Sequence, residues 1–203
     1  HAAARAAQYF LEHFPGETAY AYKANSSVFL LGALFGAGIR QFDVASLPEL
    51  EDAATLPGAT LHFMHPVKSR GAIRRAYHEF GVRCVSLDSE DELEKLMVET
   101  GYAKDLQLFV RLSVPAVNSS IPLEDKFGAD PRAAVSLVQA TRQRCDELGL
   151  TFHVGSQTAT PDAYIHALGL VRKVIVEAGV VIDGIDVGGG FPSRYSAAKP
   201  SPL

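Results

Sequence analysis

The sequence predicts an α/β protein whose chain forms an incomplete (β/α)8 barrel of about seven βα units. The first observation is that short apolar runs alternate with amphipathic segments along most of the chain. The second is that most of these runs are continuously apolar, which is typical of parallel strands covered on both faces. The third is spacing, because successive strands mostly begin about 20 residues apart, enough for a strand, a helix and two short loops.

The expected strands are short, and helical patterns separate them. They cover residues 19–24, 41–45, 61–65, 84–87, 108–113, 151–154 and 182–187. A complete barrel runs to roughly 250 residues, and this chain has 203, so the barrel is expected to be one strand short. The alternative is an open doubly wound sheet, which normally carries a Gly-x-Gly-x-x-Gly turn after its first strand. Here that strand ends in Lys23-Ala24-Asn25, so the barrel is preferred.

The helix starts carry capping signals. Ser46 with Glu49, and Ser89 with Glu92, each form a capping box, in which the hydroxyl accepts a backbone N–H and the carboxylate returns to the cap. Two more starts pair a cap residue with a first-turn proline, at Asp130-Pro131 and at Thr160-Pro161.

Helix interiors and ends are marked by apolar spacing and by glycine. One helix is expected to pack a single stripe on the sheet, formed by Ala134, Val138, Thr141, Cys145 and Leu148. Helices are expected to stop at Gly38, Gly101, Gly149 and Gly179. Between the fifth and sixth strands, residues 115–129 form an excursion of the kind that carries function in barrel enzymes.

Composition excludes several classes of protein. Lys plus Arg number 19 and Asp plus Glu number 23, a net charge of −4, which argues against nucleic acid as a partner. The longest apolar stretch, 28–37, is too short to span a bilayer. The two cysteines, Cys84 and Cys145, read as packing residues of a reduced, cytoplasmic protein, and no cysteine–histidine cluster has metal-binding spacing. Both ends of the chain look cut, since it opens on His1 inside a helical pattern.

Active sites of parallel barrels lie at the carboxyl ends of the strands. The polar residues expected there are Lys23, Asn25, Asp43, Ser46, His65, Asp88, Arg111, His153, Ser156, Asp186 and Gly188-Gly189-Gly190. Lys23 has two interpretations. By position alone it is a lysine that reaches solvent at a strand end; in the functional interpretation an apolar barrel mouth lowers the pKa of its amine, which suits Schiff-base chemistry.

The triple glycine also has two interpretations. It is a tight turn, or it is a backbone nest that binds phosphate, with Ser156 adding a hydroxyl donor. His153 lies in an apolar run, where a histidine is more often a core residue. Arg111 also lies among apolar residues, so we expect a carboxylate partner for it, with Asp43 and Glu49 as candidates.

Five motifs in order resemble the barrel domain of the PLP-dependent basic amino-acid decarboxylases, which share the barrel of alanine racemase. They are Tyr-Ala-Tyr-Lys-Ala-Asn at 20–25, Phe-Asp-Val-Ala-Ser at 42–46, Lys-Phe-Gly at 126–128, Phe-His-Val-Gly-Ser at 152–156 and Asp-Val-Gly-Gly-Gly-Phe-Pro at 186–192. The segments at 65–68 and 87–89 look most like the ornithine and lysine branch. The resemblance implies that residues 1–203 are a partial PLP-binding barrel domain.

The resemblance also implies roles. Lys23 would bind pyridoxal 5′-phosphate covalently, His153 would stack on its ring, and Ser156 with the glycines 188–190 would hold its phosphate. Asp43, Glu49 and Arg111 would form the polar set around the bound cofactor, and Asp186 would support the glycine turn. A C-terminal β-domain, absent from this chain, would supply further catalytic residues across a homodimer with shared active sites, so the chain alone is expected to be inactive.

The implied function is decarboxylation of ornithine or lysine in polyamine biosynthesis. One alternative is a diaminopimelate-type decarboxylase or an amino-acid racemase on the same barrel. Another, from a different class, is a non-catalytic homologue that binds a partner protein; Lys23, which such a homologue is expected to lose, is present.

Overall fold

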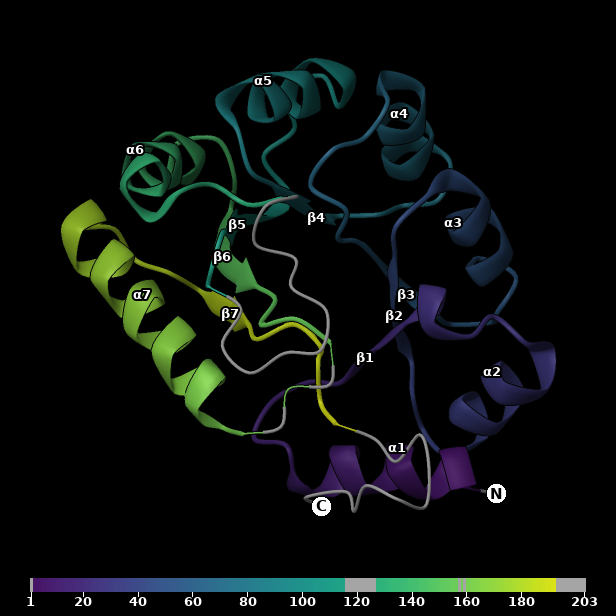
Figure 1. Cartoon of the computed structure of the whole chain (residues 1–203). Coiled ribbons are helices and arrows are strands. Elements are labelled where there is room, and N and C mark those ends of the chain that lie inside the picture. Colours follow the sequence, from purple (N-terminus) through teal and green to yellow (C-terminus); the bar gives the residue numbers. More distant parts are fainter. Residues whose placement is uncertain (1, 116–126, 157, 159, 193–203) are drawn as a thin grey trace. The chain divides into compact units, whose positions relative to one another are not determined.

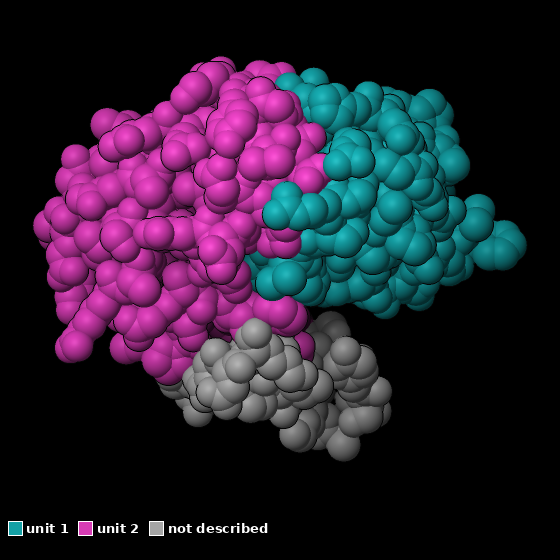
Figure 2. Space-filling model, turned by 90° about the horizontal axis from the view of Figure 1, so that it is seen from above, with its two compact units in different colours: residues 1–85 teal, residues 86–203 magenta. Residues whose placement is uncertain are grey.

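A computed structural model of the chain describes residues 2–115, 127–156, 158 and 160–192 (Figure 1). His1, Lys126, the excursion between 116 and 126 and the segment 193–203 lie outside the described residues. The chain divides into two compact units, residues 1–85 and 86–203, which Figure 2 colours teal and magenta. The boundary falls within strand β4 (Cys84–Leu87).

The first unit is a parallel βα assembly. Its elements are α1 (Ala2–His13), β1 (Ala19–Ala21), the 3-10 turn η1 (Tyr22–Ala24), α2 (Val28–Gly36), β2 (Gln41–Val44), α3 (Leu47–Ala53), β3 (Thr60–Phe63) and α4 (Arg70–His78). Strands β1, β2 and β3 pair in parallel in chain order, and β3 pairs with the start of β4. Helices α2, α3 and α4 follow the outer side of these strands (Figure 1).

The second unit repeats the same plan. After β4 it contains α5 (Glu90–Glu99), β5 (Gln107–Leu112), α6 (Pro131–Arg142), β6 (Glu147–Phe152), α7 (Asp162–Ala178) and β7 (Gly184–Asp186). Strand β6 pairs in parallel with β5 on one side and with β7 on the other. All four residues of β4 and the last five of β6 are buried, as expected for parallel strands covered on both faces, whereas β2 and β5 alternate.

The sixth strand begins earlier than the sequence pattern predicts, and the stripe drawn through Cys145 and Leu148 is wrong. Helix α6 ends at Arg142, and Leu148 and Gly149 lie inside β6. Gly149 therefore does not end a helix. A Cβ there would lie 2.2 Å from Cε1 of Phe109 on the neighbouring strand, so the missing side chain makes room for an aromatic ring.

Most of the predicted helix starts are confirmed. The hydroxyls of Ser46 and Ser89 accept the N–H groups of the residues three positions on, and the Asp130 carboxylate accepts an N–H at the start of α6. The prediction that Thr160 caps α7 is wrong, because Pro161 occupies the cap position and makes no side-chain capping bond. Among the described residues, no helix combines the length and the apolar character that a membrane crossing requires.

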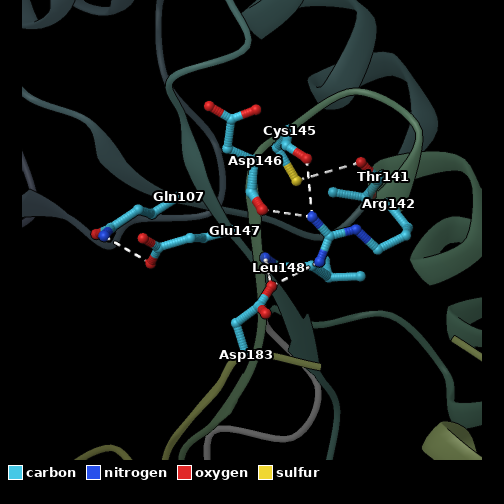
Figure 3. Close-up of polar contacts among 8 residues, drawn as sticks. All are labelled: Gln107, Thr141, Arg142, Cys145, Asp146, Glu147, Leu148 and Asp183. Carbon is cyan, nitrogen blue, oxygen red and sulfur yellow. Dashed lines mark hydrogen bonds and ion pairs between the residues drawn. The ribbon is translucent and has the colours of Figure 1, made fainter. Parts of the chain in front are cut away.

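A polar cluster joins the amino-terminal ends of β6 and β7 (Figure 3). The Arg142 guanidinium donates to Asp183 at 2.6 Å and to the carbonyls of Cys145 and Asp146 at 2.9 and 2.5 Å. The Asp183 carboxylate also accepts the N–H of Leu148 at 2.8 Å. The end of α6 and the starts of two strands are thereby connected at the edge of the sheet where barrels keep stabilising contacts.

Replacing Asp183 with asparagine is expected to lower the free energy of unfolding by about 1 kcal/mol, a value reduced for solvent screening because the side chain is 38% exposed. The Leu148 N–H, and then Arg142, hold the pKa of Asp183 below its usual 3.8. Because this carboxyl has the lower pKa in the folded state, its contribution is complete above pH 3.8 and is lost as the pH falls through the folded value.

Urea unfolding of wild type and Asp183→Asn between pH 3 and pH 7 measures this effect. The difference in stability between the two proteins should narrow as the pH falls below 3.8. Asp146→Asn is the matched control, because Asp146 accepts from Arg142 with its backbone carbonyl, which the substitution keeps. A stability difference that stays constant down to pH 3 contradicts the prediction.

Candidate active site

Lys23 lies just beyond the carboxyl end of β1. The predicted strand runs to residue 24, but β1 ends at Ala21, and Tyr22–Ala24 form the single 3-10 turn η1. The Lys23 side chain is exposed. The interpretation from position alone, a lysine that reaches solvent, therefore describes this structure, and the burial assumed by the functional interpretation does not.

Side-chain hydrogen bonds hold the turn that carries Lys23. The buried Tyr22 donates its hydroxyl to the Asp52 carboxylate on α3. Tyr20 donates to the carbonyl of Asn25 at 3.1 Å, and the Asn25 side chain accepts the N–H of Ser27 at 2.9 Å. The sequence gives no sign of the contact between Tyr22 and Asp52, since an aromatic residue in an apolar strand is typical of the core.

Asp43 and Glu49 lie in the same unit as Lys23. Asp43 is half-buried in β2, in register with Ala21 of β1. The Glu49 carboxylate accepts the N–H of Ala45 at 2.7 Å, so it completes the start of α3 much as the capping box predicts. The roles of both carboxylates toward a cofactor stay predictions.

In the second unit, three polar residues form one row across adjacent strands. Arg111 of β5 is in register with Thr151 of β6, which is in register with Asp186 of β7. The Thr151 hydroxyl donates to the Asp186 carboxylate at 2.9 Å. Register partners in a parallel sheet face the same side, so the row places a cation and an anion on one face.

Residues 127 and 128, just before α6, contact the carboxyl ends of β4 and β5. The guanidinium carbon of Arg111 lies 5.6 Å from the centre of the Phe127 ring. The next residue, Gly128, donates its N–H to the Asp88 carboxylate at 3.0 Å. The sequence alone assigns Asp88 no role beyond that of a polar residue at a strand end, although its place directly after a buried strand is a usable signal. The expected pairing of Arg111 with Asp43 or Glu49 joins two separate units and stays a prediction.

The glycine turn follows β7 and packs backbone to backbone on the loop that follows β6. Gly188 and Gly190 have positive φ angles of 67° and 97°. A Cβ on Gly188 would lie 2.2 Å from the carbonyl oxygen of Phe152, and one on Gly190 would lie 2.2 Å from that of Gly155. The turn is held by Asp186, which accepts the N–H of Gly188 at 2.8 Å.

The middle glycine has a different environment. A Cβ on Gly189 would meet Nε2 of His153 at 3.5 Å, an ordinary contact. The Gly189 carbonyl accepts the hydroxyl of Tyr164 at 3.0 Å, and the Tyr164 ring stacks on Phe191 with centroids 5.3 Å apart. Burial raises the pKa of Tyr164 to about 12, so this phenol remains a hydrogen-bond donor at neutral pH.

The loop after β6 places His153 against this turn. The N–H of Gly155 donates to Nδ1 of His153 at 3.0 Å, which leaves the ring proton of neutral histidine on Nε2, the nitrogen nearest Gly189. The buried Thr158 donates its N–H to the carbonyl of Gly190 at 2.9 Å. Ser156 is half-buried in the same loop.

The glycine turn also carries two adjacent backbone N–H donors. Among the described residues, neither the N–H of Gly189 nor that of Gly190 has an acceptor. Adjacent amides in a glycine turn form the kind of concavity that binds anions. The second unit therefore contains a set of donors that fits a phosphate group. Within the described part of the chain, no group of three or more His, Cys, Asp or Glu side chains is placed to hold a metal ion.

Comparison with known proteins identifies the family of this chain. The model of the family "Pyridoxal-dependent decarboxylase, pyridoxal binding domain" matches residues 2–202. A lysine/ornithine decarboxylase from Selenomonas ruminantium is 33% identical over 91% of this chain and 48% of its own length. A diaminopimelate decarboxylase from Pseudomonas aeruginosa is 33% identical over 94% of this chain and 49% of its own length. The chain spans about half the length of the curated relatives it matches.

The fold is also that of solved decarboxylases. A lysine/ornithine decarboxylase from Vibrio vulnificus, crystallised with putrescine, is 31% identical with a TM-score of 0.78, over 96% of this chain and 52% of that one. The prediction of an α/β fold of the barrel class is thus confirmed, and the doubly wound alternative is wrong. The family match over nearly the whole chain shows that it belongs to the pyridoxal-dependent decarboxylases.

Proposed function

We propose that this chain, over residues 1–203, is the partial barrel domain that binds pyridoxal 5′-phosphate in a basic amino-acid decarboxylase. The observation that carries the proposal is the glycine turn. Two of its three glycines sit where any Cβ would strike neighbouring backbone, and the two amides at its centre have no acceptor among the described residues. Such a turn can bring its N–H groups to the oxygens of a phosphate.

Each proposed residue has a separate task. Gly188, Gly189 and Gly190, with the Ser156 hydroxyl, bind the phosphate and fix the depth of the cofactor. Lys23 supplies the amine for covalent attachment. His153 presents its imidazole beside the turn, where it covers one face of the cofactor ring. When bound, pyridoxal phosphate supplies an electron sink for the electrons that remain after CO2 leaves.

Charged residues at the strand ends would orient the substrate. We propose Arg111, Asp43 and Glu49 as the polar set around the cofactor. The row of Arg111, Thr151 and Asp186 supports this, because it already holds charges of both signs in fixed register. Orientation matters, because the bond to the departing carboxylate must be held in line with the electron system of the cofactor.

The proposed substrate is lysine or ornithine, and the product is the corresponding diamine of polyamine biosynthesis. The segments 65–68 and 87–89 favour this branch by resemblance, and a lysine/ornithine decarboxylase is among the relatives. A meso-diaminopimelate substrate is the second candidate, favoured by the relative from Pseudomonas aeruginosa at the same 33% identity. We further propose a cytoplasmic homodimer with shared active sites, from the family resemblance and the sparse cysteines.

Product analysis of the full-length protein, purified with its cofactor as the holoenzyme, tests the function. The enzyme is incubated separately with L-ornithine, L-lysine and meso-diaminopimelate, and CO2, putrescine, cadaverine and L-lysine are quantified. We expect CO2 with a diamine from ornithine or lysine. Lysine formed from diaminopimelate identifies the second candidate. Racemised amino acid without CO2, or bound cofactor without any turnover, contradicts the proposal.

A further inference from the structure

The turn that carries Lys23 has little structure of its own to hold it. Strand β1 has three residues and η1 has three. The turn has no side-chain capping bond, and Asn25 after it is fully extended, with φ −168° and ψ 111°. A single 3-10 turn between extended segments is a weak local element, because its hydrogen-bond geometry is poor. Its position therefore depends on what its side chains contact.

Tyr22 is the side chain that anchors this turn. It is 2% exposed, although it directly precedes the exposed Lys23. The turn packs against β2 and α3, and the Tyr22 hydroxyl donates to the Asp52 carboxylate on α3. A buried phenol needs a partner for its hydroxyl, since leaving it unpaired costs free energy.

Asp52 is an unexpected residue for its place in the helix. It lies in the last turn of α3, one residue before the helix ends at Ala53. The helix dipole disfavours a carboxylate there. The Asp52 carboxylate accepts the hydroxyl of Tyr22 from another element. We therefore expect Asp52 to serve this contact and not to stabilise its own helix. Burial, then the hydrogen bond to Asp52, then the charges of Asp52 and Glu49 raise the pKa of Tyr22 above 10, so its phenol stays a donor at neutral pH.

We propose that Tyr22 and Asp52 together are positioning residues for Lys23, holding η1 so that its amine is presented for covalent attachment of the cofactor. This inference rests on the proposed function. Lys23 and Tyr22 are adjacent in one turn, so a rotation of the turn that frees the phenol must also move the lysine. Neither positioning residue is required to touch the cofactor.

A double-mutant cycle on the holoenzyme tests the inference. Tyr22→Phe keeps the buried ring and removes the hydroxyl; Asp52→Ala removes the acceptor and relieves the unfavourable charge at the end of α3. Three quantities are measured: the Kd of pyridoxal phosphate for the apoenzyme by absorbance, the rate at which borohydride fixes cofactor on the Lys23 peptide, and the melting temperature. Each variant should raise Kd roughly tenfold and slow fixation, with no further change in the double variant.

Two controls separate positioning from general stability. Tyr102→Phe removes a phenol–carboxylate bond at an exposed site, where Tyr102 donates to Glu94 of α5 at 2.8 Å. Asp183→Asn lowers stability at the amino-terminal edge of the strands. Both controls should leave Kd within twofold of wild type. Equal loss of affinity in the controls overturns the inference, and so does a Tyr22→Phe effect that Asp52→Ala fails to reproduce.

The failure of the inference is distinguishable from failure of the proposed function. If wild type fixes cofactor on Lys23 and the Tyr22 and Asp52 variants keep its Kd and rate, the inference alone is wrong. If wild type fixes no cofactor on Lys23, the proposed function is overturned and the inference with it.

Discussion

Replacing Lys23 with alanine or with arginine is expected to abolish covalent attachment of pyridoxal phosphate and to lower kcat at least about a thousandfold, as for loss of a group that forms a covalent bond in the reaction. Arginine keeps the positive charge and a similar length, but its guanidinium stays protonated and is not a nucleophile. Because Lys23 is exposed, neither change should unfold the turn. The melting temperature of the apoenzyme should therefore stay within a few degrees of wild type.

Borohydride reduction of the wild-type holoenzyme, followed by peptide mass spectrometry, locates the attachment. The label should appear on the peptide that contains Lys23 and be absent from both variants. Lys173→Ala is the matched control, since Lys173 is exposed on α7 and lies 3.9 Å from Glu177. A label on any other lysine, or variants that keep wild-type turnover, would show that Lys23 does not carry the cofactor.

The order of strands and helices is predicted well from the sequence, because this order depends on local signals. Apolar runs place β2 and β4 within a residue of their observed bounds, and the capping hydroxyl of Ser46 marks the start of α3. The same logic fails at β6, since helical spacing through Cys145 and Leu148 continues by coincidence past the real end of α6 at Arg142. Residues 147–152 instead pair with β5, where Gly149 leaves room for the Phe109 ring, and such a contact between strands leaves no local pattern in the sequence.

The site shows the same division. Lys23, His153, Ser156 and the triple glycine are named by motif, and the structure gives each a defined place beyond a strand. The supporting residues are missed, because their partners are remote in sequence. Tyr22 meets Asp52 thirty residues on, Asp88 meets Gly128 forty residues on, and Tyr164 meets Gly189 twenty-five residues on. A polar group at a strand end is visible in the sequence, whereas its hydrogen-bond partner depends on the register of the sheet.

The glycine turn is where the structure adds most to the sequence. The motif gives the three glycines one shared task, which is to hold the phosphate of the cofactor together with Ser156. The structure distinguishes the three positions on different grounds. A Cβ on Gly188 or Gly190 would meet a backbone oxygen at 2.2 Å, and both residues have positive φ; a Cβ on Gly189 would have an ordinary 3.5 Å contact with His153.

Gly188→Ala and Gly190→Ala are therefore expected to lower the free energy of unfolding by about 2 to 4 kcal/mol each, from left-handed strain plus a clash that neighbouring backbone cannot relieve cheaply. Because β6 and its loop must move to accept the methyl group, cofactor affinity should fall in both variants. Gly189→Ala is the matched control for the fold and should unfold with wild type within about 0.5 kcal/mol. Its Kd for pyridoxal phosphate then measures a separate quantity, the closeness of the Gly189 amide to the phosphate.

Urea unfolding and cofactor titration of the three variants separate these effects. Strain predicts that Gly188→Ala and Gly190→Ala lose stability even as apoenzymes, before any ligand is added. Contact with the phosphate predicts that Gly189→Ala keeps the stability of the apoenzyme. Its cofactor binding should weaken by about 1 to 3 kcal/mol, which is what a charge-assisted hydrogen bond contributes. Three variants with equal stability contradict the backbone packing described for the turn. If Gly189→Ala changes neither stability nor Kd, the packing described for the turn still holds, but the Gly189 amide does not contact the phosphate.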